Sequence, residues 1–167
     1  MDPTFPTLAA SNGARHVISA VALVALGNLV DAELDGQPTA NADGDDLNNL
    51  ADEDGVVFTS PIEPGQNATV DVTATVPLLL DAWMDFNADG DWNDPGEQIF
   101  TNQPLAAGLN NLVFPVPPTA IPFADIYARF RASSLGGLTP EGLALDGEVE
   151  DYFVTMVPVS LQSFTIE

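Results

Sequence analysis

The sequence predicts an all-β fold, an antiparallel β-sandwich with long acidic calcium-binding loops. Three observations support this prediction. Short runs rich in Val, Ile, Leu, Phe and Thr recur between Pro and Gly turns, one of these runs alternates strictly, and helical periodicity is weak after residue 50. The chain has 167 residues, enough for one domain with a sizeable core, and 46% of them are hydrophobic. We therefore expect it to fold despite its charge.

Residues 68–76 form the clearest predicted strand. Val70, Val72 and Ala74 share one face, and Thr and Asp residues occupy the other, as expected of a half-buried antiparallel strand. Turn signals such as Pro64-Gly65 and Gly136-Gly137 separate the predicted strands. The further strands predicted are residues 55–60, 79–86, 98–101, 110–116, 125–134 and 149–158.

The N-terminal third allows two interpretations. Residues 16–26 fit either one short helix of about three turns or a strand that ends at a Gly27-Asn28 turn, and their composition does not decide between these. We expect residues 1–157 to form a single module, with 1–54 as an acidic segment packed on it. Residues 158–167 fit a final strand or the start of a linker to a following domain.

Charge and composition exclude several classes of function. The formal net charge is −22, with 25 Asp and Glu against 3 Arg and no Lys, which excludes nucleic acids and anionic membranes as partners. The absence of Cys removes disulfides, thiol nucleophiles and thiolate metal sites. No apolar run approaches the ~20 residues of a membrane span. Acidity without Lys or Cys favours an extracellular location.

The acidic residues gather in three blocks, 31–54, 81–97 and 141–151, which hold twenty of the 25. The middle block has oxygen-bearing side chains at alternate positions with Gly90 at the sixth, the pattern of a loop that wraps one calcium ion. Its last carboxylate stands at position 13 instead of 12, and its flanks are strand-like. A solvated acidic turn is the alternative. The ligands predicted here are Asp85, Asn87, Asp89, Asp91 and Glu97.

The first block is less regular. Nine carboxylates within 24 residues, with no base nearby, repel one another unless cations bind or screen them. Oxygen ligands without His or Cys select calcium over zinc or copper. A flexible acidic loop is the alternative. The ligands predicted here are Asp31, Glu33, Asp35, Asp43, Asp45, Asp52 and Asp54.

The third block alternates acidic and apolar residues as it enters a strand. If Val149 faces inward, Asp151 does too, and a buried carboxylate needs a partner. Arg129 and Arg131 lie two residues apart, so both point to the same side of their strand. We expect a structural ion pair of these arginines with Asp151, rather than an exposed acidic strand or a third metal site.

Seven separated strings, in order, resemble the GEVED domain and its usual upstream segment. The resemblance covers nearly the whole chain and implies a β-rich accessory module of large secreted or surface-attached bacterial proteins, not a defined catalyst. The strings are GARHV (13–17), LGNLVDAELDGQP (26–38), ADGDD (42–46), DEDGV (52–56), AWMDFNADGDWNDPGEQIF (82–100), ARFR (128–131) and DGEVEDY (146–152).

Catalysis is poorly supported. The chain has one histidine, His16, and no GxSxG string, so a serine triad lacks its usual parts. We therefore predict a non-enzymatic protein: a calcium-stabilised extracellular module, with one or more ions, that spaces neighbouring domains or serves adhesion. The alternative is a carbohydrate-binding module that holds a polysaccharide or cell-surface glycan on exposed aromatics beside the calcium loops. The candidates are Trp83, Trp92 and Tyr127.

Overall fold

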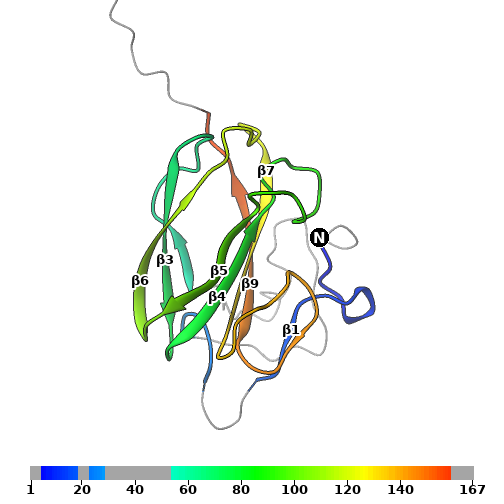
Figure 1. Cartoon of the computed structure of the whole chain (residues 1–167), viewed down its shortest axis with the longest axis vertical. Coiled ribbons are helices and arrows are strands. Elements are labelled where there is room, and N and C mark those ends of the chain that lie inside the picture. Colours follow the sequence, from blue (N-terminus) through cyan, green and yellow to red (C-terminus); the bar gives the residue numbers. More distant parts are fainter. Residues whose placement is uncertain (1–4, 19–22, 29–53, 159–167) are drawn as a thin grey trace, which may run out of the picture.

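The computed structural model describes residues 5–18, 23–28 and 54–158, which form nine strands and one 3-10 turn. A three-stranded antiparallel sheet has the order β2-β3-β6, and a four-stranded antiparallel sheet has the order β5-β4-β7-β9. The two sheets lie in separate layers (Figure 1). The predicted all-β sandwich is confirmed. The bounds are β2 Val56–Phe58, β3 Asn67–Ala74, β4 Leu78–Met84, β5 Gln98–Leu105, β6 Gly108–Pro115, β7 Asp125–Ser133 and β9 Glu148–Thr155.

The main core lies between the two sheets. The alternation predicted for β3 is observed, since Ala68, Val70, Val72 and Ala74 are buried and the residues between them are not. Aromatic rings join the layers: Phe58 packs on Phe130 at 5.9 Å between ring centroids, and Phe100 packs on Phe114 at the same distance. Burial of these large apolar side chains is the main stabilising term of the fold.

The four-stranded sheet is covered on its outer face as well. Residues 5–16 and the connection from β7 to β9 lie over it, joined by a small parallel sheet of β1 (Arg15–His16) and β8 (Leu143–Ala144). Figure 1 shows β1 on that side, away from β3 and β6. As a result β4 and β7 are buried on both faces, although the outer face carries the polar residues Asp81, Arg129 and Arg131.

The described residues of the N-terminal third are not helical, apart from the 3-10 turn Ala9–Ser11. His16 lies in β1, and Leu26 forms an antiparallel bridge with Ala74 before Gly27 takes a positive φ of 61°. The helical interpretation of residues 16–26 is therefore wrong for residues 16–18 and 23–26. Backbone pairing with existing strands competes with the local helix there. Residues 159–167, where a final strand or linker was expected, lie outside the described residues.

Candidate metal centre

The middle acidic block forms the connection from β4 to β5, residues 85–97. Its backbone is organised by Asp85, whose Oδ1 and Oδ2 accept hydrogen bonds from the N–H groups of Asp89 (3.2 Å) and Gly90 (3.1 Å). The turn needs left-handed backbone at Ala88 (φ 55°) and Gly90 (φ 96°), which explains the Gly at the sixth position. The base of the loop closes where Met84 N–H donates to Glu97 O at 2.9 Å.

Three carboxylates converge on the outside of this loop. Asp89, Asp91 and Asp94 each offer an oxygen, and these atoms lie within 4.8 Å of one another. Asn87 joins the group, because its Nδ2 donates to Asp89 Oδ2 (2.9 Å) and to Asp94 Oδ2 (2.7 Å). Carboxylate and amide oxygens are the ligands that hard cations prefer. This cluster could hold a metal ion.

Glu97 closes the loop from the inside. It is only 2% exposed, and its Oε2 accepts a hydrogen bond from Asp94 N–H at 3.1 Å. Its buried Oε1 has no hydrogen-bond partner among the described residues. Burial, with the nearby carboxylates of Asp85, Asp94 and Asp89, raises the pKa of Glu97 from 4.5 to about 7. Burial also raises the pKa of Asp85. In both cases burial is the main cause, because it disfavours the charged form of the carboxyl group.

No arginine compensates the negative charge of this loop. The chain has only three Lys and Arg residues, and all three side chains bind elsewhere. Arg15 donates to the carbonyls of Ala9 and Gly13. Arg129 and Arg131 bind other partners on the outer face of the four-stranded sheet. Two carboxylates about 4 Å apart repel by about 1 kcal/mol even in water. None of the three arginine side chains therefore binds the carboxylates of this loop.

The predicted ligands are only partly brought together. Asp89 and Asp91 belong to the carboxylate cluster, whereas Asp85 orders the loop backbone and Glu97 lies on the inner side. Asp94 also belongs to the cluster but was not among the predicted ligands, because it lies three positions after Asp91 and so outside the alternate spacing. Asp54, predicted as a ligand in the first block, instead accepts hydrogen bonds from Asn28 N (2.9 Å) and Nδ2 (3.4 Å). The other candidates of that block, Asp31, Glu33, Asp35, Asp43, Asp45 and Asp52, lie outside the described residues.

The aromatic residues of the alternative, carbohydrate-binding interpretation are not an exposed platform: both tryptophans are buried and Tyr127 is half-buried. Trp83 is 3% exposed and Trp92 6% exposed, and together with Phe5 they form a second apolar cluster. The Phe5 ring lies 4.5 Å from that of Trp92 and 4.8 Å from that of Tyr127. Trp83 shares its side of β4 with buried Asp81, and the N-terminal segment covers that side through Phe5.

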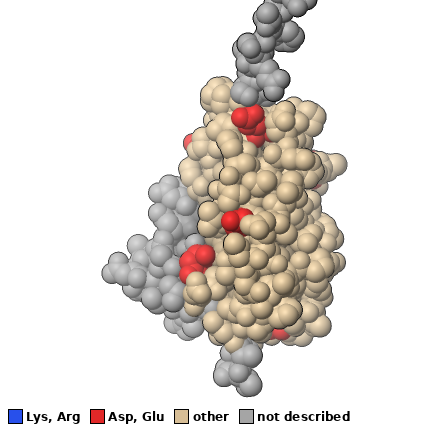
Figure 2. All heavy atoms as spheres, turned by 90° about the vertical axis from the view of Figure 1, so that its left-hand side faces the viewer, with Lys and Arg blue, Asp and Glu red and all other residues tan. Residues whose placement is uncertain are grey.

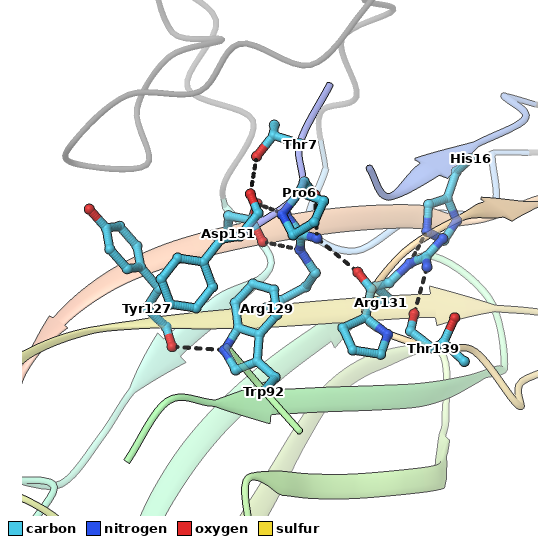
Figure 3. Close-up of polar contacts among 11 residues, drawn as sticks. Pro6, Thr7, His16, Trp92, Tyr127, Arg129, Arg131, Thr139 and Asp151 are labelled. Atoms are coloured by element: carbon cyan, nitrogen blue, oxygen red, sulfur yellow. Dashed lines mark hydrogen bonds and ion pairs between the residues drawn. The ribbon is translucent and has the colours of Figure 1, made fainter. Parts of the chain in front are cut away.

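Arg129 forms the expected ion pair with Asp151. Its Nε and Nη2 donate to the two carboxylate oxygens at 2.7 and 2.6 Å, and its Nη1 donates to the carbonyls of Pro6 and Pro140 (Figure 3). The guanidinium also lies over the Trp92 ring, 4.8 Å from its centroid. This side chain therefore ties β7 and β9 to the N-terminal segment and to the connection above them.

Arg131 does not take part in that pair as predicted. Its donors go to neutral acceptors: Nη1 to the carbonyls of Thr139 and Glu141, and Nη2 to that of Gly142 (2.9 Å) and, at 3.3 Å, to that of Arg15. Nε donates to His16 Nε2 at 3.1 Å (Figure 3). The prediction failed because residues 139–142 lie against the guanidinium, and their carbonyls accept the hydrogen bonds that a carboxylate was expected to accept.

The contacts of His16 define its protonation state. Nε2 accepts from Arg131, so the ring proton is on Nδ1, which donates to Asp146 O at 2.7 Å. Burial and the Arg131 charge lower the pKa of His16 to about 3. The imidazole is therefore neutral at physiological pH and fully occupied by structural hydrogen bonds.

The acidic residues of the third block bind backbone groups. Glu148 Oε2 accepts from Leu26 N–H (2.7 Å), and Glu150 Oε1 accepts from Gly55 N–H (2.9 Å). Asp146 accepts from Ser134 N and Oγ. Glu148 and Glu150 point to one side of β9 and Asp151 to the other, as alternation along a strand requires. This role of the two glutamates was not predicted.

These features define a class of protein: a β-sandwich whose β4–β5 loop presents a carboxylate cluster and whose last strand binds backbone groups through its acids. Residues 79–155 match the family model described as the GEVED domain, as the resemblance implied, and this stretch contains both features. GEVED domains are extracellular-type modules of larger proteins. Searches of curated proteins and of solved structures found no match. No helix among the described residues is long and apolar enough to cross a membrane.

Proposed function

We propose that this chain is a non-catalytic, calcium-stabilised module of a larger secreted or surface-attached protein, where it spaces neighbouring domains or serves adhesion. The observation that carries the proposal is the loop 85–97, in which three carboxylates converge while a buried oxygen of Glu97 has no partner in the described part of the chain. Neighbouring domains of the parent protein are the partners proposed. The buried tryptophans remove the observation that favoured a glycan-binding surface.

Calcium fits this loop better than other metals. The available ligand atoms are carboxylate oxygens, with neither Cys nor His in the cluster. The loop is irregular and largely exposed, which suits the flexible coordination of calcium more than the strict octahedron of magnesium. Extracellular calcium modules bind with dissociation constants of about 10⁻⁴ to 10⁻³ M, so such a site fills on export.

The position of the loop explains how an ion would stabilise the fold. The loop joins the end of β4, a central strand, to the start of β5, an edge strand. An ion that binds only the folded loop stabilises the native state by about 2.7 kcal/mol at 100 times its dissociation constant. For a marginally stable domain this is a large fraction of the total.

The chemistry of the described side chains supports a non-catalytic role. A general base must be able to take up a proton, but both ring nitrogens of His16 are engaged and its pKa is lowered to about 3. The chain offers no cysteine or lysine as a nucleophile. Both tightly buried arginines are held by structural partners.

Thermal unfolding tests the proposal. We expect calcium to raise the Tm of EDTA-treated protein by about 5–10 °C, and magnesium to raise it much less, because 2.7 kcal/mol corresponds to such a shift for a chain of this size. A variant with Asp89→Asn and Asp91→Asn should lose a clear part of the shift, whereas the exposed control Asp125→Asn should keep it. If calcium does not raise the Tm of the unsubstituted protein, calcium stabilisation is contradicted. If the double variant shows the full rise in Tm, the ion does not bind at Asp89 and Asp91.

A further inference from the structure

A pocket of about 230 Å³ lies between the loop 85–97 and the connection from β6 to β7. Its polar lining comes from Asn87, Asp94, Glu97 and Thr119, and Phe86 and Pro117 contribute apolar walls. The loop and the β6–β7 connection form it together, and Ile121 N–H donates to Phe86 O at 2.9 Å to hold them side by side. A water molecule takes about 30 Å³ of liquid, so the pocket has room for an ion with several waters.

Glu97 provides a ligand in this pocket. Its carboxylate is held in place, because Oε2 accepts from Asp94 N–H, while the buried Oε1 has no hydrogen-bond partner among the described residues. A buried carboxylate oxygen without a donor is costly unless a cation, a proton or water satisfies it. The carboxylates of Asp85, Asp89 and Asp94 lie near Glu97, and their negative charge favours a cation in the pocket over an anion.

Glu97 does not belong to the outer cluster. The close group of carboxylate oxygens contains Asp89, Asp91 and Asp94 but not Glu97. Asp94 lines the pocket and also belongs to the outer cluster, so it lies between the two positions. Asn87 spans them too, since its amide donates to Asp89 and Asp94 on the outer side.

We propose that the loop holds two cations: an outer one at Asp89, Asp91 and Asp94, and an inner one in the pocket, bound by Glu97 Oε1 and the shared carboxylate of Asp94 with water completing its shell. The inner position rests on the proposed function, because it assigns a second calcium to the same loop. It explains why a glutamate is buried without a counter-charge at the end of the loop, where an exposed acid would serve a single ion.

The number of calcium ions bound per chain tests this inference. The whole chain is equilibrated with saturating free calcium, and bound calcium is measured by dialysis and elemental analysis, as a difference from the unsubstituted protein. The inner variant is Glu97→Gln, whose amide oxygen can still accept from Asp94 N–H. The outer variant combines Asp89→Asn and Asp91→Asn. Glu141→Gln is the matched control, since Glu141 lies in the β7–β9 connection and belongs neither to the carboxylate cluster nor to the pocket lining.

We expect a loss of one ion in the inner variant, one in the outer variant, two when they are combined, and none in the control. If the combined variant loses only one ion, all these groups share one site, and the inner position is wrong while the proposed function stands. If Glu97→Gln loses none, the inner position is also wrong. If the unsubstituted protein binds no calcium, the proposed function itself fails. Far-UV circular dichroism checks that each variant is folded.

Discussion

The two buried arginines differ in the groups that accept hydrogen bonds from their side chains. Arg129 and Arg131 are each 1% exposed, yet Arg129 has a bidentate carboxylate while Arg131 has four carbonyls and an imidazole. A buried guanidinium is tolerated only when its donors are met. The arrangement around Arg131 requires a neutral His16, since a protonated ring could not accept from Nε. This requirement makes the fold sensitive to acid at one residue.

The pH dependence of stability should reveal His16. Because its pKa is near 3 in the folded protein and 6.5 in the unfolded chain, the unfolded chain binds more protons between these values, and stability falls as pH falls below 6.5. His16→Gln keeps an acceptor for Arg131 but does not titrate. We expect it to be less stable at pH 7.5, and the difference to shrink by about 1–2 kcal/mol by pH 5. Urea unfolding in EDTA measures this, and a constant difference contradicts the assignment.

At the level of elements, β9 joins the parts of the fold through its acidic side chains. Glu148 and Glu150 bind the backbone of Leu26 and Gly55, and Tyr152 donates to Glu150 (2.9 Å) and accepts from Val56 N–H (3.2 Å). The two carboxylates thus join an edge strand of one sheet to segments at the other sheet. Asp151 on the opposite side reaches the outer layer through Arg129. One strand therefore binds both layers.

The start of β9 depends on Gly147. Its φ is 94°, and a Cβ there would lie 1.8 Å from the carbonyl oxygen of Ala132 on β7. We expect Gly147→Ala to destabilise the protein by more than about 2 kcal/mol, through backbone strain plus the steric clash. Gly137→Ala is the matched control, because Gly137 also has a positive φ but no atoms crowd its Cβ position. It should cost about 1 kcal/mol. Equal losses of unfolding free energy in the two variants would contradict the steric argument.

At the level of the whole molecule, charge is distributed unevenly. The side formed by β3 and β6 shows few carboxylates in Figure 2, and its exposed residues include Leu109 and Val113. Many described acids instead lie in the loop 85–97 or bind backbone groups in and beside β9. The face formed by β3 and β6 therefore carries little charge, whereas the four-stranded sheet holds buried acidic and basic side chains in β4, β7 and β9.

The outer layer should unfold together with the sandwich. Phe5 is 4% exposed and packs on Trp92 and Tyr127, so Phe5→Ala should cost about 3–5 kcal/mol and shift tryptophan emission to longer wavelength. The chain has only two tryptophans, and both lie in this cluster, so the signal reports on it alone. Phe123→Ala, at a side chain that is 72% exposed, should change stability by less than about 0.5 kcal/mol. An unshifted emission in Phe5→Ala would show that residues 5–16 do not seal this face.

Strands and turns could be predicted because their signals are local. The alternation of β3 and the turn glycines Gly65, Gly136 and Gly137 appear in the structure as expected, the glycines with positive φ. The acidic loop 85–97 was predicted from alternate oxygen-bearing side chains, yet the approach of Asp94 to Asp89 and Asp91 and the burial of Glu97 were not. A loop pattern gives the spacing of the ligands but not the direction in which each side chain points.

The sequence by itself determined the all-β class, most of the strands, the acidic loop and the pairing of Arg129 with Asp151, because alternation and residue type act over a few residues. Only the tertiary structure decided that Trp83 and Trp92 are buried, that Arg131 binds carbonyls and His16, and that Glu148 and Glu150 hold the backbone of Leu26 and Gly55. These contacts join residues up to 122 positions apart. Which segment covers a sheet face depends on chain topology, and no local pattern encodes it.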